Sequence, residues 1–143
     1  MTITNHAVTG VLVATIVDKP LVGIPLAFLS HFAVDILPHF GYKQQGLGNY
    51  FQHKLSYLVI GVDMFTVFAL VIFTWHQPWW VYAAGFAGVA PDFAWPYRYY
   101  FFEKRGHAKP GEGSKFNQWH SRIQWCERPW GILFEIAWVI LVL

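Results

Sequence analysis

Two histidines and a carboxylate stand at a regular spacing where an apolar run ends. In the stretch SHFAVDILPHF, His31, Asp35 and His39 follow one another every fourth residue. Residues i and i+4 lie on one face of a helix, so His31 and Asp35 can bind the same ion. Pro38 disfavours helix at Leu37, so we expect His39 to leave the line of the helix at its end, as a third ligand that reaches the ion only if the chain turns back. Imidazole and carboxylate groups suit zinc, or manganese and iron where carboxylates dominate.

The composition predicts what surrounds these groups. Of the 143 residues, 55% are hydrophobic and 13% are charged, whereas a soluble domain has about 25% charged residues. A soluble domain of this length could not bury that much apolar surface, so we expect an all-α, polytopic membrane protein with a single domain, residues 1–143. This composition excludes nucleic-acid binding. The lone cysteine, Cys126, excludes an internal disulfide and a cysteine metal knuckle.

Five apolar segments are candidate transmembrane helices of one bundle. They are Ile3–Val17, Leu21–Leu37, Leu58–Trp75, Trp79–Trp95 and Trp130–Leu143. A hydrocarbon core about 30 Å thick needs roughly 20 helical residues, so the first and last segments are short. The sequence DKP between the first two favours a hairpin over a kink in one helix, because Asp and Lys flank a helix-breaking Pro.

Charge and residue size predict how the segments are arranged. With five spans, every Lys and Arg except Lys19 falls on the face that carries the N-terminus and the loops 38–56 and 96–129. The positive-inside rule places this face in the cytoplasm. The sequence AAGFAGVA in the fourth segment predicts close helix packing. Phe116–Trp125 has the pattern of an amphipathic helix on the membrane surface.

Ionisable side chains inside spans are candidate functional residues, because each costs roughly 2.5–3.5 kcal/mol to insert. All of them lie towards the predicted cytoplasmic half. They are His6, His31, Asp35, Asp63, Asp92 and Glu135, with His39 and His53 at the membrane edge. We expect these histidines, Asp35 and Asp92 to be metal ligands, joined by His120 folding back from the amphipathic helix.

Asp63 and Glu135 are the candidate catalytic residues. Low-dielectric surroundings would raise the pKa of either carboxyl group and suit it to general-base chemistry. The alternative is that each pairs with an Arg or Lys of the loops. For His31 and Asp35 the alternative is a pair that only joins helices, and for His53 a solvated interfacial position.

Three features of the chain carry a family resemblance. An early His6, the stretch HFAVDILPH and the stretch PDFAW at Pro91 occur in this order. Together they resemble the YdjM-like family of inner-membrane proteins, predicted to be metal-dependent hydrolases. The resemblance implies a small multispanning helical protein that holds a metal at one membrane face through His6, His31, Asp35 and Asp92.

The chain departs from that family at one loop. The family typically shows an HRGxTHS-like stretch, and the nearest equivalent here is KRGHAKP, Lys104 to Pro110, which lacks the second His. One expected ligand is therefore missing, or is replaced by His120 or His53. HFAVD is also similar to the His-xxx-Asp zinc pair of zinc-dependent phospholipases C, which implies lipid phosphoesters as substrates.

The leading hypothesis is a membrane-bound, metal-dependent hydrolase of an amphiphilic substrate, with a phosphoester as one option, at the cytoplasmic face of the inner membrane. Membrane lipids are the expected partners. The basic loops would attract an anionic head group, through Arg98, Lys104, Arg105 and Arg122. The alternatives are a non-catalytic accessory subunit of a membrane complex and a metal or proton transporter. A homo-oligomer fits any of these.

Overall fold

The computed structural model describes residues 1–42, 50–107 and 114–142, and its regular elements are helices. They are α1 (Ile3–Val17), α2 (Pro20–Asp35), α4 (Lys54–Phe73), α5 (Trp79–Val89), η1 (Ala90–Phe93), α6 (Ala94–Arg98), η2 (Tyr99–Glu103), α7 (Lys115–Ile123) and α8 (Gly131–Val142). The predicted all-α class is confirmed. Lys43, residues 108–110 of the KRGHAKP loop and Leu143 lie outside the described residues.

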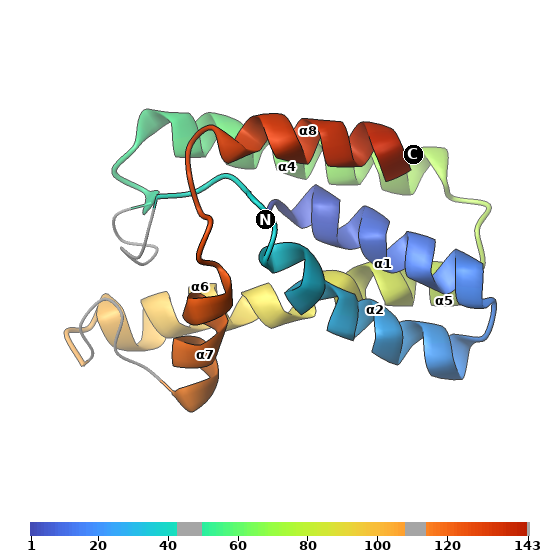
Figure 1. Cartoon of the computed structure of the whole chain (residues 1–143), viewed down its shortest axis with the longest axis horizontal. Coiled ribbons are helices and arrows are strands. Elements are labelled where there is room, and N and C mark those ends of the chain that lie inside the picture. The colour runs from blue at the N-terminus through green and yellow to red at the C-terminus, as the bar shows by residue number, and fades with distance from the viewer. Residues whose placement is uncertain (43–49, 108–113, 143) are drawn as a thin grey trace.

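Helix α1 lies at the centre of the bundle and packs against α2, α5, α4 and α8 (Figure 1). It ends at Val17, and Asp18 takes a left-handed conformation with φ of 47°. Pro20 then begins α2, where a missing N–H costs nothing because the first turn has no intrahelical partner. The DKP sequence therefore forms a hairpin, and α1 and α2 pack side by side.

Small residues allow α1, α2 and α5 to approach closely. The contact between them is built on Ala14, Ala27 and Ala84, each fully buried. A Cβ atom added to Gly10 of α1 would lie 2.5 Å from the carbonyl oxygen of Ala84 in α5. The predicted close packing of the AAGFAGVA segment is confirmed at this contact, because the two backbones touch where a side chain would stand.

The largest buried side chains are polar, whereas many large side chains on the surface are apolar. The largest side chains that are almost fully buried are all polar: His6, His31, His39, His120, Glu135, Asn5, Asp35 and Ser56. Large apolar side chains face outward instead, with exposed fractions of 92% for Leu21, 83% for Phe73 and 74% for Ile140. Soluble proteins show the opposite distribution of large apolar and ionisable side chains.

One described helix, α4, is long and apolar enough to cross a membrane, and it has 20 residues. Helices α1, α2 and α8 are apolar but shorter. The fourth expected segment, Trp79–Trp95, is not one α-helix, because α5 stops at Val89 and a 3₁₀ turn containing Pro91 follows. Proline removes a backbone donor and its ring clashes with the preceding turn. Membrane-length helices therefore do not match all five expected spans.

Replacing Gly10 with alanine tests the close contact of α1 and α5. We expect Gly10→Ala to lower the free energy of unfolding by about 1–3 kcal/mol, because the new methyl group meets a backbone carbonyl that cannot rotate away. The measurement is unfolding of the detergent-solubilised protein by dodecyl sulfate, followed by circular dichroism. Gly61→Ala is the matched control, since nothing lies within 4 Å of its added Cβ. Equal stability of the two variants would contradict the assignment.

Candidate metal centre

Three elements bring four potential ligands together. Helix α2 carries His31 and Asp35 one turn apart, and the first turns of α1 carry His6. The 3₁₀ turn η1 carries Asp92, directly after Pro91. Each of His6, His31, Asp35 and Asp92 offers one ligand atom, and these atoms all lie within 4.8 Å of one another.

In this group, the Nε2 atom of each histidine lies close to one oxygen of each carboxylate. His6 Nε2 lies 3.2 Å from Asp35 Oδ1 and 3.5 Å from Asp92 Oδ2. His31 Nε2 lies 3.1 Å from Asp35 Oδ2 and 3.6 Å from Asp92 Oδ1. The two imidazole rings stack with centroids 3.9 Å apart. Both nitrogens therefore point to the space that the two carboxylates enclose.

The hydrogen bonds of the two histidines leave nitrogen lone pairs for a metal. His31 Nδ1 lies 2.7 Å from the carbonyl oxygen of Gly88, which can only accept, so Nδ1 carries a proton. In the neutral form of this ring, Nε2 then has the lone pair that a metal can bind. An outer hydrogen bond of this kind fixes the tautomer of metal-binding histidines. His6 Nε2 faces the Asp35 and Asp92 carboxylates, whereas its Nδ1 is buried and has no hydrogen-bond partner within the described part of the chain.

The donor set fits a divalent cation. Atoms bound at about 2.0–2.2 Å to one zinc ion lie at most about 4.4 Å apart, and the four candidate ligand atoms lie within 4.8 Å of one another, so small side-chain shifts would bring them to one ion. Two neutral imidazoles and two carboxylates supply a charge that a divalent cation balances. Zinc accepts this mixture of ligands, as do manganese and iron.

Helix α7 closes the group from one side. His120 Nε2 lies 2.8 Å from Asp35 Oδ2 and 3.1 Å from His31 Nε2, and Gln124 Nε2 donates to the same Asp35 oxygen at 3.0 Å. Phe32 of α2 contacts the His120 ring edge to face at 5.6 Å. The expected fold-back of His120 is therefore observed. Gln124 was missed, although its spacing of four residues from His120 repeats the His31–Asp35 pattern.

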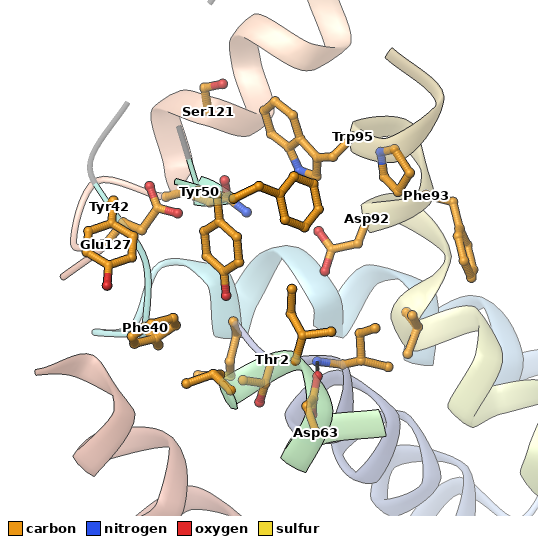
Figure 2. A pocket seen from close by; sticks show the side chains of 18 of the residues that line it. Thr2, Phe40, Tyr42, Tyr50, Asp63, Asp92, Phe93, Trp95, Ser121 and Glu127 are labelled. Atoms are coloured by element: carbon orange, nitrogen blue, oxygen red, sulfur yellow. Dashed lines mark hydrogen bonds between the residues drawn. The ribbon is translucent and has the colours of Figure 1, made fainter. Parts of the chain in front are cut away.

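The group opens on one side to a cavity of about 650 Å³. The His6, His31 and Asp35 side chains are fully buried, whereas Asp92 is 21% exposed and lines the cavity. Figure 2 shows the Asp92 carboxylate directed into this space. A cavity of about 300–1,000 Å³ is typical of small-molecule sites. Asp92 is thus the candidate ligand that faces the cavity.

The first residue of the chain also reaches the group. The α-amino nitrogen of Met1 lies 3.1 Å from Asp35 Oδ1. Burial lowers the pKa of this amine, but attraction by Asp35, Asp92 and Glu135 outweighs it and raises the pKa to about 10. The amine therefore competes with a cation for the same carboxylate oxygen.

Asp63 and Glu135, the predicted catalytic carboxylates, bind the backbone at the start of α1. Asp63 of α4 accepts from the N–H groups of Ile3 at 2.8 Å and Thr4 at 2.9 Å. Glu135 of α8 accepts from the N–H groups of Thr2 at 3.1 Å and Phe40 at 3.0 Å. The first N–H groups of a helix lack intrahelical acceptors, and these carboxylates supply them. Asp63 also lines the cavity.

His39 and His53 lie outside the group of four ligands. His39 Nδ1 donates to the carbonyl oxygen of Leu37 at 2.8 Å, and its backbone pairs with Glu127. Burial, aided by the positive Met1 amine, lowers the pKa of His39 to about 3 and keeps its ring neutral. His53 stacks on Tyr42 with ring centroids 3.8 Å apart. His39 thus lies just after α2 and His53 just before α4, and neither joins the candidate ligands.

The four basic residues expected to attract an anionic head group have different surroundings. Arg98 is buried and forms an ion pair with Glu103 at 3.0 Å. Lys104 and Arg105 are exposed and lie over the rings of Tyr100 and Phe101. Arg122 lines the cavity and is the one of the four that does so.

Comparison with family models, with curated proteins and with solved structures finds no match to this chain. The assignment of a metal centre therefore depends on the geometry above.

Replacing Asp63 with asparagine tests its part in holding α1. An asparagine oxygen can accept from one of the two N–H groups, but its NH₂ group faces the other. We expect Asp63→Asn to lower the free energy of unfolding by about 1–3 kcal/mol, the cost of one buried unsatisfied group. Thr66→Val is the control on the same helix, because Thr66 bonds only within α4 in the described contacts. Unfolding in dodecyl sulfate distinguishes them, and unchanged stability of Asp63→Asn would contradict the role.

Proposed function

We propose that the protein is a membrane-embedded, metal-dependent hydrolase that acts on an amphiphilic substrate. The observation that carries the proposal is the buried group of His6, His31, Asp35 and Asp92, with one member facing a cavity of substrate size. The family resemblance supports it, since it implies these same four residues as ligands.

His6, His31, Asp35 and Asp92 would hold the cation, with zinc preferred and manganese or iron as alternatives. His120 is the candidate further ligand, because its Nε2 touches both Asp35 and His31. A bound divalent cation supplies two kinds of chemistry: it makes a nucleophile from water at neutral pH and polarises an ester or phosphoryl group.

The protein's own residues orient the site and keep water out. The Gly88 carbonyl holds the His31 ring so that Nε2 faces inward. Burial of His6, His31 and Asp35 restricts solvent to the Asp92 side, where the cavity lies. Asp63 and Glu135 position the start of α1, and a general-base role for either remains a prediction.

The distribution of apolar side chains supports a membrane location. Helix α4 has the length and hydropathy of a span, and only 17% of its most apolar window is buried inside the protein. Leu58, Phe65 and Phe68 are each more than half exposed along this helix. Lipid would cover this surface, with the basic face and the metal group on the cytoplasmic side of the inner membrane.

Metal content is the first measurement. We expect the detergent-purified protein to hold about one equivalent of zinc, manganese or iron by elemental mass spectrometry, as expected for one ligand group. His31→Ala and Asp35→Ala should each lose it, because each removes a buried ligand. His76→Ala is the control, since His76 is exposed between α4 and α5.

The same samples are assayed for turnover of 4-nitrophenyl phosphate and 4-nitrophenyl acetate. Turnover that disappears with the metal supports a hydrolase. Metal binding without turnover of either ester would leave a structural metal and favour the accessory-subunit alternative. The proposed metal centre itself fails if wild type takes up no metal after reconstitution, or if the two ligand variants retain it.

A further inference from the structure

The cavity beside Asp92 has two walls of different chemistry. One wall comes from α4 and the η1–α6 segment and carries the apolar side chains of Val59, Ile60, Phe93 and Pro96, together with the carboxylate of Asp63. The other wall comes from α7, the residues after it and the described part of the loop before α4. Phe40 and Phe51 line it as well, but most of its side chains are polar: Tyr42, Tyr50, Gln118, Ser121, Arg122, Gln124 and Glu127. Asp92 lies between the two walls.

The polar wall is rich in hydrogen-bond donors. Burial, with the nearby charges of Glu135, Asp63 and Glu127, raises the pKa of Tyr50 well above its usual range, so this hydroxyl stays protonated. Figure 2 shows the Tyr50 and Asp92 side chains both directed into the cavity. Arg122 adds a cationic side chain, and the lining also includes Met1, whose α-amine is the second cation of the cavity. Glu127 is the acidic residue on this wall, and its side chain lies beside Gly41, which follows α2.

The apolar wall extends to the outer surface of the protein. Tyr57 and Leu58, beside Val59 on α4, are 59% and 63% exposed, and Phe93 is 51% exposed. An apolar chain lying along Val59 and Phe93 would therefore continue into the surface that lipid is proposed to cover. Ser121 of α7 and Asp63 of α4 lie on opposite sides of the cavity (Figure 2).

We propose that this cavity binds a long-chain phosphoester, with its chain along Val59, Ile60 and Phe93 and its phosphate on the wall that carries Tyr50 and Arg122. The inference rests on the proposed hydrolase function and names its substrate class. The phosphate at the end of the chain would contact the wall that is rich in donors. Arginine and protonated hydroxyl groups are donors that suit phosphate oxygens. The chain meets the apolar wall, where its burial drives binding.

The reaction of such a substrate is a hydrolysis with no oxidant or reductant. The oxygen of water forms a bond to phosphorus, and the ester P–O bond to the chain breaks. One proton of the water ends on the released chain alcohol, and the other stays on the oxygen that is now bound to phosphorus. Tyr50 is placed to donate to a phosphoryl oxygen, whose charge increases as the new bond forms.

Binding is tested independently of turnover by photolabelling. The full-length protein in phosphatidylcholine nanodiscs is irradiated with dodecyl phosphate that carries a diazirine at the chain end, and labelled peptides are mapped by mass spectrometry. We expect labels at the Val59–Ile60 and Phe93–Pro96 walls, suppressed by unlabelled dodecyl phosphate. Inorganic phosphate and dodecanol should each suppress them less, since each matches one wall only.

Two variants separate chain recognition from phosphate recognition. Ile60→Trp narrows the apolar wall and should lower the ratio of kcat/KM for dodecyl phosphate to that for butyl phosphate by about tenfold or more, the scale of pocket discrimination by small groups. Tyr50→Phe should lower kcat for both by about 10²–10³, as for loss of one transition-state donor. Val71→Trp, on the exposed part of α4, is the control and should change neither.

The possible outcomes distinguish a wrong substrate class from a wrong hydrolase function. Turnover of 4-nitrophenyl phosphate with labels scattered over the lipid-facing surface would overturn the substrate class and leave the hydrolase standing. Competed labels at the two walls without any turnover would support the binding site and overturn the hydrolase. A dodecyl-to-butyl ratio unchanged in Ile60→Trp would overturn the assignment of the chain to the α4 wall.

Discussion

At the end of α2, the carboxylate of Asp35 is buried where water cannot solvate it, and the surrounding helices supply its partners. Oδ1 lies near the Met1 amine and His6 of α1, and Oδ2 near His31 of α2 and His120 of α7. An isolated buried carboxylate would be very costly, whereas one surrounded by donors or a cation is stable. Because these partners come from three helices, a single carboxylate fixes how α1, α2 and α7 meet.

The need of buried polar groups for partners also attaches the more peripheral helices, α4 and α8. The first backbone N–H groups near the start of α1 need acceptors, and Asp63 of α4 and Glu135 of α8 provide them. Negative charge at a helix N-terminus is also favoured by the helix dipole. These two carboxylates join α4 and α8 to α1 at the end where His6 and the cavity lie. The residues that hold the bundle together thus also place the candidate ligands.

The sequence predicted local features of the site better than its long-range contacts. The His31–Asp35 pair follows from helix periodicity alone, and the hairpin at Pro20 follows from the chemistry of its residues. The predicted depth of a group along a span is a weaker guide, because it says how far along a helix the group lies but not which way it points. For Asp63 the depth predicts a catalytic role, and the structure adds a structural role that depth does not predict, because its carboxylate accepts from backbone N–H groups of α1. Its direction depends on how α4 packs against α1.

Gly88 shows why packing and chemistry could not be separated from the sequence. In the AAGFAGVA segment its absent side chain predicts only a close helix contact, and a Cβ there would lie 2.5 Å from the carbonyl oxygen of His6. The carbonyl oxygen of Gly88 also accepts the proton of His31 Nδ1 at 2.7 Å. At Gly88, the close approach of α1 and α5 therefore has two effects. It places the backbone of His6, and it sets the tautomer of His31. A contact that looks like packing alone positions both imidazoles towards the same space.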